Sequence, residues 1–547
     1  MSTDPCATHT VFNQAPPFED VNLFTTDKAL AEALQREGSA WAEERARAFG
    51  EIVGRRETIA WGFEANENRP VLRPFDRAGH RIDEVEYHPA WHSLMALGVG
   101  HGLHALPWRE VRSGAHVARA AMFMLLAEVE AGVGCPLSMT YSAVPALRHQ
   151  PELAAEWEAR LTSTVYDPRL IPPGEKGGAL CGMAMTEKQG GSDVRANTTQ
   201  ARPAGTSGEY EVTGHKWFCS APMCDAFLVL AQAPGGLSCF LLPRFTPGGE
   251  RNRIHLQRLK DKLGNRSNAS SEIELHAAWA RLVGEEGRGV PTILEMVNHT
   301  RLDCVIGSAA GMRWGTARAI HHAAHRSAFG KLLVAQPLMR NVLADLALES
   351  EAATVAMMRL ARAYDGDDAE HATFRRLATA VLKYWVCKRA PVHAAEALEC
   401  LGGNGYVEEW GLARTYREAP LNGIWEGSGN VQCLDVLRAL QKSPESLSAL
   451  FAEIREARGG DHRLDTFAME LRKAFEDPEE AEVRARRLVE RLALALQASL
   501  LIRHSPPDVA DAFVASRLAG DGGRAFGTLP AGTDFAAILE RAAPHTL

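Results

Sequence analysis

The stretch Met185-Thr-Glu-Lys-Gln-Gly-Gly-Ser-Asp193 decides the fold, because it separates the apolar residues 179–184 from a segment with a strand-like pattern. Its two adjacent glycines let a backbone approach a flat or anionic ligand without Cβ clashes. Thr186 and Ser192 offer hydroxyl groups, and the N–H groups of such a loop can form an anion-binding nest. A glycine-containing turn before a hairpin would have the same composition. Taken alone, the stretch is therefore either a ligand loop or an ordinary turn.

The spacing of apolar residues changes twice along the chain. Short apolar segments with strand-like composition, separated by Gly-, Pro- and Asn-rich breaks, occupy residues 209–214, 226–231, 238–242 and 272–275. Helical spacing dominates residues 26–150 before them, and residues 290–325, 336–364, 367–398 and 429–440 after them. Residues 446–547 are helical again, after a linker that begins at Lys442. We therefore predict a small β module between two helical regions, followed by further helices.

Size and charge limit the possible functions. The chain has 547 residues, enough for about three or four domains at roughly 150 residues each. Hydrophobic residues make up 46% and charged residues 23%, as in ordinary globular proteins. The net charge of −8 excludes a surface that is basic all over, so any contact with DNA must come from a local patch.

Cysteine usage and the lack of long apolar runs predict a cytoplasmic protein. The ten cysteines form no Cys-x-x-Cys pair and lie in apolar stretches, which is typical of reduced, buried side chains. The first residues lack the charged and apolar regions of a signal peptide. No run of about 18 apolar residues is present, so we expect no membrane span.

Several separated segments resemble the acyl-CoA dehydrogenase superfamily, most closely its branch of alkylation-response flavoproteins. They are residues 185–193, Lys216-Trp-Phe-Cys-Ser220, Arg326-Ser-Ala-Phe-Gly330, Leu401-Gly-Gly-Asn-Gly-Tyr406 and Ile424-Trp-Glu-Gly-Ser-Gly-Asn430. The resemblance implies an α+β, mainly α fold, with an N-terminal helical domain (1–178), a small central β-barrel domain (179–288) and a helix bundle (289–440). Residues 441–547 would form an extra C-terminal helical domain.

The resemblance also implies FAD as the cofactor. Family members place the counterparts of Thr186 and Ser220 beside the isoalloxazine ring, and Phe218 stands where Trp is usual. Arg326 would bind the FAD diphosphate of a neighbouring subunit, because its forked guanidinium group suits two phosphate oxygens. Pro337 stands where the family often has a Gln that contacts the same group. The residues expected at FAD are Met185, Thr186, Gly191, Ser192, Phe218, Ser220, Arg326, Phe329, Gly402, Gly403, Trp425, Gly427, Ser428 and Asn430.

Glu426 is the catalytic residue that the resemblance implies. In the family, a carboxylate in this segment removes the α-proton of an acyl-CoA while a β-hydride passes to the flavin. Burial would raise the pKa of Glu426 and strengthen it as a base. From its position alone, Glu426 could instead be an acidic residue stabilised at a helix N-terminus. Arg301 is a candidate substrate contact, and Asp261, Asn265 and Asn268 could line the cleft or form a turn.

Subunits and DNA are the expected macromolecular partners. If Arg326 and residues 401–406 serve a neighbour's FAD, a dimer is the smallest complete unit, and the family pattern is a homotetramer, a dimer of dimers. Residues 8–23 read as an extended segment that could wrap a partner, anchored by Val11, Phe12, Phe18 and Leu23. Double-stranded DNA would bind a helix face that carries Arg484, Arg487 and Arg491, unless this is simply a charged, solvated helix.

Histidines 321, 322 and 325 lie together in a predicted helix. Histidines at positions i and i+4 can bind zinc on one helix face. No acidic or cysteine partner lies nearby in sequence, so we expect a solvated helix and no metal site.

Three functions are compatible with these patterns. The first is an FAD flavoprotein that keeps a weak dehydrogenase site and binds DNA in the response to alkylation damage. The second is a working acyl-CoA dehydrogenase for a short branched or unusual acyl-CoA. The third is a structural protein that shields DNA and holds a vestigial flavin.

Overall fold

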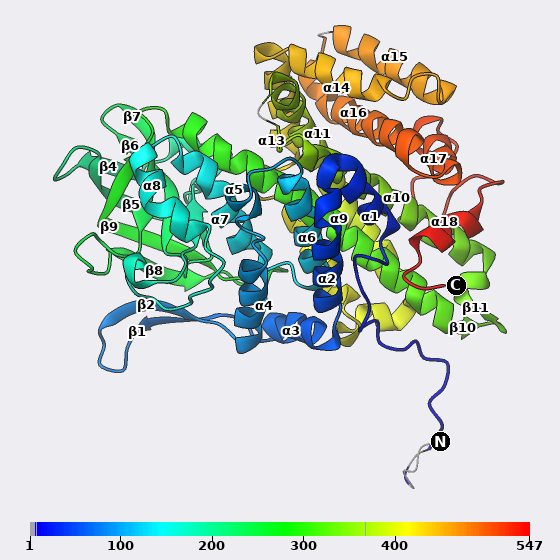
Figure 1. Cartoon of the computed structure of the whole chain (residues 1–547), viewed down its shortest axis with the longest axis horizontal. Coiled ribbons are helices and arrows are strands. Elements are labelled where there is room, and N and C mark those ends of the chain that lie inside the picture. Colours follow the sequence, from blue (N-terminus) through cyan, green and yellow to red (C-terminus); the bar gives the residue numbers. More distant parts are fainter. Residues whose placement is uncertain (1–5, 7, 367, 478, 547) are drawn as a thin grey trace.

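The computed structural model describes residues 6, 8–366, 368–477 and 479–546. Two predictions fall partly outside these ranges. The prediction about a signal peptide rested partly on residues 1–5, and one expected helix began at residue 367. Helices form most of the molecule and surround one side of a small β module (Figure 1). The predicted fold class, mainly helical with a central β module, is confirmed.

The N-terminal helices pack around α6 and α7, whose sequences are apolar on nearly every side and therefore buried on nearly every side. A β-hairpin, β1–β2, interrupts them and was not predicted from the sequence pattern. Pro74 lies inside β1, and a proline within a short run argues against a strand unless it is at an edge. The elements are α1 Lys28–Leu34, α2 Glu43–Val53, α3 Arg56–Glu67, β1 Val71–Phe75, β2 Arg81–Glu86, α4 Pro89–Gly100, α5 Leu106–Arg109, α6 Ala115–Val129, α7 Gly134–Leu147 and α8 Pro151–Leu161.

The β module is a small closed barrel. Strands β5 and β9 form its longest antiparallel pair, from Glu209↔Arg281 to Ser220↔Ser270. Strand β6 pairs with β4 and β7, and β7 pairs with β9, so the ring closes, while β3 and β8 extend it. Closure leaves few free strand edges. The strands are β3 Cys181–Ala184, β4 Gln200–Pro203, β5 Glu209–Ser220, β6 Ala226–Ala233, β7 Gly236–Pro243, β8 Ile254–Leu259 and β9 Ser270–Val283.

Helix α9 connects the parts of the molecule. It runs for 37 residues, Gly289–His325, and packs against α6 and α7 of the N-terminal region as well as α10 and α11. The short strands β10 Ser327–Ala328 and β11 Lys331–Leu332 follow it. The other helices of this bundle are α10 Pro337–Arg362, α11 Ala369–Glu399, α12 Leu412–Glu418 and α13 Gly429–Lys442.

The helices after residue 441 pack directly on this bundle. Glu453 on α14 accepts hydrogen bonds from Arg359 of α10 and Arg503 of α16, at 2.6 and 2.5 Å. Arg541 on α18 pairs with Glu32 of α1 and Glu351 of α10. These helices are α14 Glu445–Arg455, α15 His462–Glu476, α16 Ala481–His504, α17 Pro507–Phe513 and α18 Phe535–Ala542. No helix in the described ranges is long and apolar enough to cross a membrane.

The extended segment near the N-terminus is only partly anchored. Phe18 and Leu23 are buried, as expected. Val11 and Phe12 are 74% and 80% exposed, so they do not anchor the segment within this chain, and their contact with a partner subunit stays a prediction. The cysteines follow the prediction more closely, because nine of the ten are buried and only Cys6 is exposed.

Candidate functional site

A cavity of about 1100 Å³ lies where the barrel meets α6, α7, α9 and the loop before α13. Many of the residues that the sequence analysis singled out line it, although they come from four distant segments. They are Met185, Thr186, Gly191, Ser192, Phe218, Ser220, Arg301, Trp425, Glu426, Gly427 and Ser428.

The loop 185–193 is held in place by Glu187, which points away from the cavity. The carboxylate pairs with Lys216 of β5 at 2.8 Å, and both side chains are fully buried. It also accepts hydrogen bonds from the backbone N–H groups of Thr198 and Thr199. These bonds outweigh the effect of burial and hold the pKa of Glu187 well below its usual value. Glu187 therefore fixes the loop, while its neighbours Thr186 and Ser192 face the cavity.

On the barrel side, Phe218 and Ser220 lie near the end of β5. Phe218 lies on the cavity wall and is 46% exposed, with the Lys260 ammonium group 4.8 Å from its ring centroid, so part of the ring is left open there. The Ser220 hydroxyl lies 3.0 Å from the Ser270 hydroxyl. An open aromatic face beside a paired hydroxyl group suits a flat ring system with hydrogen-bonding atoms at its edge.

Glu426 has a strained backbone that three side chains hold. Its φ is +58°, in the left-handed region that non-glycine residues rarely adopt. Lys383 of α11 is buried and donates to the carbonyl oxygens of Trp425 and Gly427, at 2.7 and 2.6 Å. The Glu426 carbonyl accepts from Arg301 Nε at 3.0 Å and from Gln432 Nε2 at 3.1 Å. The peptide groups around Glu426 are thus fixed from α9, α11 and α13.

One carboxylate oxygen of Glu426 is left without a partner. Its Oε2 atom is buried and has no hydrogen-bond partner in the structure. Burial raises the pKa of the carboxyl group, although Thr300, Lys383 and Arg301 act in the opposite direction. A buried carboxylate with an unused lone pair and a raised pKa is suited to accept a proton from a bound molecule.

Arg301 has structural partners in addition to its place on the cavity wall. Its guanidinium group pairs with Asp435 at 2.8 Å and holds the Glu426 carbonyl, and the side chain is buried. Asp435 also pairs with Arg376. Arg301 therefore supports the Glu426 loop, and fewer of its N–H groups are left to bind a substrate.

Five predicted cofactor residues lie elsewhere. Arg326, Phe329, Gly402 and Gly403 do not line the cavity, and Phe329 is fully exposed. Arg326 donates to the Asn13 carbonyl at 2.6 Å. It is the C-cap residue of α9 and follows Arg301 by 25 residues, which corresponds to about 38 Å at the rise of an α-helix. Asn430 accepts a hydrogen bond from Arg486 instead of facing the cavity. One chain therefore does not bring these residues to its own cavity.

The loop before β9 contributes further polar groups. Asn265 and Lys262 line the cavity, whereas Asp261 pairs with Arg69 at the surface. The Asn265 N–H donates to the carboxyl group of Glu418 at 2.8 Å, and Asn268 donates to the Asn265 side chain. Burial and the neighbouring Glu130 raise the pKa of Glu418 to about 7.

A second polar group in the cavity was missed by the sequence analysis. Glu128 of α6, with Ser308 and Trp314 of α9, lines the wall, and each has a buried polar atom without a partner. Burial raises the pKa of Glu128 well above its usual value. The sequence contains a signal for Glu128, because it is an acidic residue inside the apolar run of α6. Lys383 has a similar signal, because it is a charged residue inside the apolar part of α11.

The arginines predicted to contact DNA lie on α16, but two have acidic partners. Arg484 lies 3.4 Å from the Asp477 carboxylate, and Arg491 lies 3.1 Å from Glu470. Arg487 forms no ion pair with any described residue. The patch is therefore less basic than the sequence suggests.

The prediction of a solvated helix around His321, His322 and His325 is wrong. His321 and His322 are buried in α9, and only His325 is exposed. Burial lowers the pKa of both buried rings to about 4. The helix is covered there by the segments around Pro16 and His545, which are remote in sequence.

Comparison with known proteins defines the class. The chain matches the models of the AidB N-terminal domain of adaptive response proteins over residues 13–168, the middle domain of acyl-CoA dehydrogenases over 182–278, and their C-terminal domain over 287–441. The chain is therefore a member of the acyl-CoA dehydrogenase family. It is 47% identical to "Putative acyl-CoA dehydrogenase AidB" of Escherichia coli (strain K12), covering 94% of this chain and 95% of that protein.

Solved structures agree with this assignment. Caenorhabditis elegans ACDH-11 in complex with C11-CoA has a TM-score of 0.84 at 27% identity, covering 98% of this chain and 93% of that one. An acyl-CoA dehydrogenase from Bacillus anthracis complexed with FAD has a TM-score of 0.61 at 19% identity, covering 78% of each chain. The family and fold are those of FAD-dependent oxidoreductases, and FAD is the cofactor. The open Phe218 face and the unpaired Glu426 oxygen in one large cavity fit such a group.

Proposed function

We propose that the protein oxidises an acyl-CoA thioester between its α- and β-carbons. The observation that carries this proposal is the Glu426 carboxylate, whose Oε2 atom is buried and unpaired in the wall of the cavity. The predicted cofactor residues Thr186, Ser192, Phe218 and Ser220 line the same cavity.

In this mechanism Glu426 removes the α-proton of the thioester. When bound, FAD supplies the acceptor for the β-hydride, so the substrate loses one proton and one hydride and becomes an enoyl-CoA. The raised pKa makes Glu426 a stronger base. Lys383, Arg301 and Gln432 hold the backbone so that the carboxylate keeps one direction. The Glu426 N–H can donate to the thioester oxygen, where negative charge develops.

The cavity follows α9 over a length that the flavin and the acyl chain would share. Its lining residues on α9 extend from Val290 to Trp314, about 36 Å at the rise of an α-helix. The structural similarity to ACDH-11, which was solved with C11-CoA, favours a medium or long acyl chain over the short branched chain that the sequence also allowed.

Anaerobic titration with acyl-CoA thioesters tests the proposal. A series of straight chains from four to fourteen carbons, together with isovaleryl-CoA, should include one that bleaches the flavin absorbance of the purified protein. Glu426→Gln should still bind FAD and should not bleach. An intact flavin that no thioester reduces would contradict the proposed activity.

We propose a homotetramer, with FAD sites completed between subunits. Arg326, Phe329, Gly402 and Gly403 do not line the cavity of their own chain, and Phe329 and the two glycines are exposed. Exposed apolar side chains close to them in sequence, Phe329, Leu332, Leu338 and Tyr406, are suited to a subunit contact. Sedimentation should give a tetramer mass, and Arg326→Ala should weaken FAD binding. A monomer that binds FAD at full occupancy would contradict this arrangement.

Binding of double-stranded DNA, as part of an alkylation response in the cytoplasm, is a second candidate function. It is supported by Arg487, which has no ion pair within the described part of the chain, and by its position next to Arg486 on α16. Such binding would be independent of base sequence and would weaken steeply with salt. Changing Arg484, Arg487 and Arg491 to Ala should weaken duplex binding, and unchanged affinity would remove this patch from consideration.

A further inference from the structure

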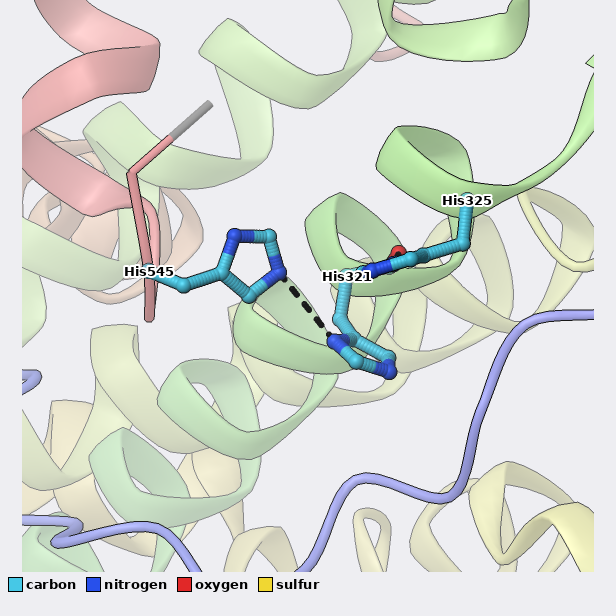
Figure 2. Close-up of side chains that lie close together, drawn as sticks. All are labelled: His321, His325 and His545. Carbon is cyan, nitrogen blue, oxygen red and sulfur yellow. Dashed lines mark hydrogen bonds between the residues drawn. The ribbon is translucent and has the colours of Figure 1, made fainter.

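Three histidines meet near the C-terminal end of α9, far from the cavity. His321 and His325 lie four residues apart on one face of the helix, and His545, from the segment after α18, lies beside them (Figure 2). One ring nitrogen from each residue lies within 4.8 Å of those of the other two. His321 Nδ1 and His545 Nε2 are 3.1 Å apart.

The other nitrogen of each ring already has a backbone partner. His321 Nε2 lies 2.9 Å from the Pro16 carbonyl oxygen, His325 Nδ1 lies 2.8 Å from that of His321, and His545 Nδ1 lies 3.3 Å from that of Thr546. A carbonyl oxygen only accepts, so in a neutral ring each of these nitrogens carries the hydrogen. The lone pairs are then left on His321 Nδ1, His325 Nε2 and His545 Nε2.

The lone pairs of His321 Nδ1 and His545 Nε2 face one another and repel unless a cation lies between them. A shared proton could join His321 to His545, but it would leave the third ring without a role. A divalent metal uses all three. Two nitrogens bound to one tetrahedral zinc at about 2.05 Å are roughly 3.3 Å apart, close to the 3.1 Å between His321 and His545. Metal-binding histidines commonly donate their other N–H group to a backbone carbonyl, as these three do.

The ligand type selects the metal. Within the described residues the group contains imidazoles alone, without a carboxylate or thiolate, and imidazole favours zinc and its neighbours over magnesium or calcium. Arg318, one turn earlier on α9, adds positive charge nearby and lowers the affinity. His321 lies 20 residues beyond Arg301, about 30 Å along the helix, so this group is separate from the Glu426 cavity of its own chain.

We propose that His321, His325 and His545 bind a divalent transition-metal ion of the zinc type. Three imidazoles leave one position for water. The metal ties the segment after α18 to α9 and, through the Pro16 carbonyl, to the extended N-terminal segment.

Zinc titration of the full-length, FAD-loaded protein tests this proposal after removal of metals with a chelator. Calorimetry should show one equivalent of zinc that binds tightly, and His545→Ala or His325→Ala should weaken that step at least 100-fold. His462→Ala is the control, because this histidine has a side chain that is 92% exposed and lies outside the group. Hydrogen exchange of residues 535–546 should slow on addition of zinc in the wild type, and not in His545→Ala.

Two results would overturn the proposal. One is zinc binding of equal affinity in the wild type and in both variants of the group. The other is an equal loss in His462→Ala, which would indicate weak binding by surface histidines. Unchanged FAD absorbance in each variant would show that the fold is intact.

Discussion

Lys383 offers a sharp test of how the structure positions Glu426. It is buried on α11 and donates to the carbonyl oxygens on both sides of Glu426. A left-handed φ at a non-glycine residue costs about 1–3 kcal/mol, which this loop can sustain only while its peptide groups are held. Lys383→Met keeps the length of the side chain and removes both hydrogen bonds.

The magnitude follows from the strain. Without Lys383 the loop around Glu426 can relax and release up to about 1–3 kcal/mol of backbone strain. Every 1.4 kcal/mol released reduces the fraction of molecules with Glu426 in the reactive geometry about tenfold. Arg301 and Gln432 still hold the Glu426 carbonyl, so the loss is partial. We expect the bleaching rate with the best acyl-CoA to fall about 10- to 100-fold.

Stopped-flow absorbance under anaerobic conditions measures this rate. Lys388→Met is the matched control, because Lys388 lies on the same helix but is exposed, and it should leave the rate unchanged. The FAD content of each variant shows whether the fold is intact. A rate within twofold of the wild type in Lys383→Met, with FAD bound, would refute the positioning role.

Three further predictions concern buried charges. Glu187→Gln leaves Lys216 buried without its anionic partner, so urea denaturation should show that the free energy of unfolding falls by about 3–5 kcal/mol. The control is Lys188→Ala at the exposed neighbouring residue, which should change it little. A decrease below about 1 kcal/mol in Glu187→Gln would contradict the prediction. The pKa of Glu418 is about 7 in the folded protein, above its value near 4.5 in the unfolded chain. Between these two pH values the folded state holds a proton that the unfolded chain has lost. The free energy of unfolding should therefore decrease by up to about 3 kcal/mol as pH rises from about 4.5 to about 7. Denaturation curves of Glu418→Gln should lack this decrease; an unaltered pH dependence would contradict the assignment. Because burial raises the pKa of Glu426, the bleaching rate should increase with pH through a pKa above the usual carboxyl value, and a rate independent of pH down to 4 would contradict its role as base.

The order of helical and β regions was readable from the sequence, because it depends on local periodicity. The β-hairpin was not, since Pro74 hides β1. The segments that line the cavity were found through their resemblance to a family, since residues 186, 218 and 426 are far apart in the chain.

The supporting residues could not be assigned from sequence in the same way. Lys216 and Lys383 read as ordinary charges until the fold shows them buried against Glu187 and the Glu426 loop. His321 was judged by its neighbours in sequence, whereas its partners Pro16 and His545 lie more than 200 residues away. Burial and long-range pairing, which decide the state of a charged group, are properties of the packed structure.

The reaction of the flavin with an acyl-CoA thioester tests the central claim most directly. The wild-type protein, titrated without oxygen, should lose its flavin absorbance with at least one straight-chain thioester, while Glu426→Gln keeps both its FAD and its colour. Bleaching of equal rate and extent in Glu426→Gln would contradict the assignment of Glu426 as the base.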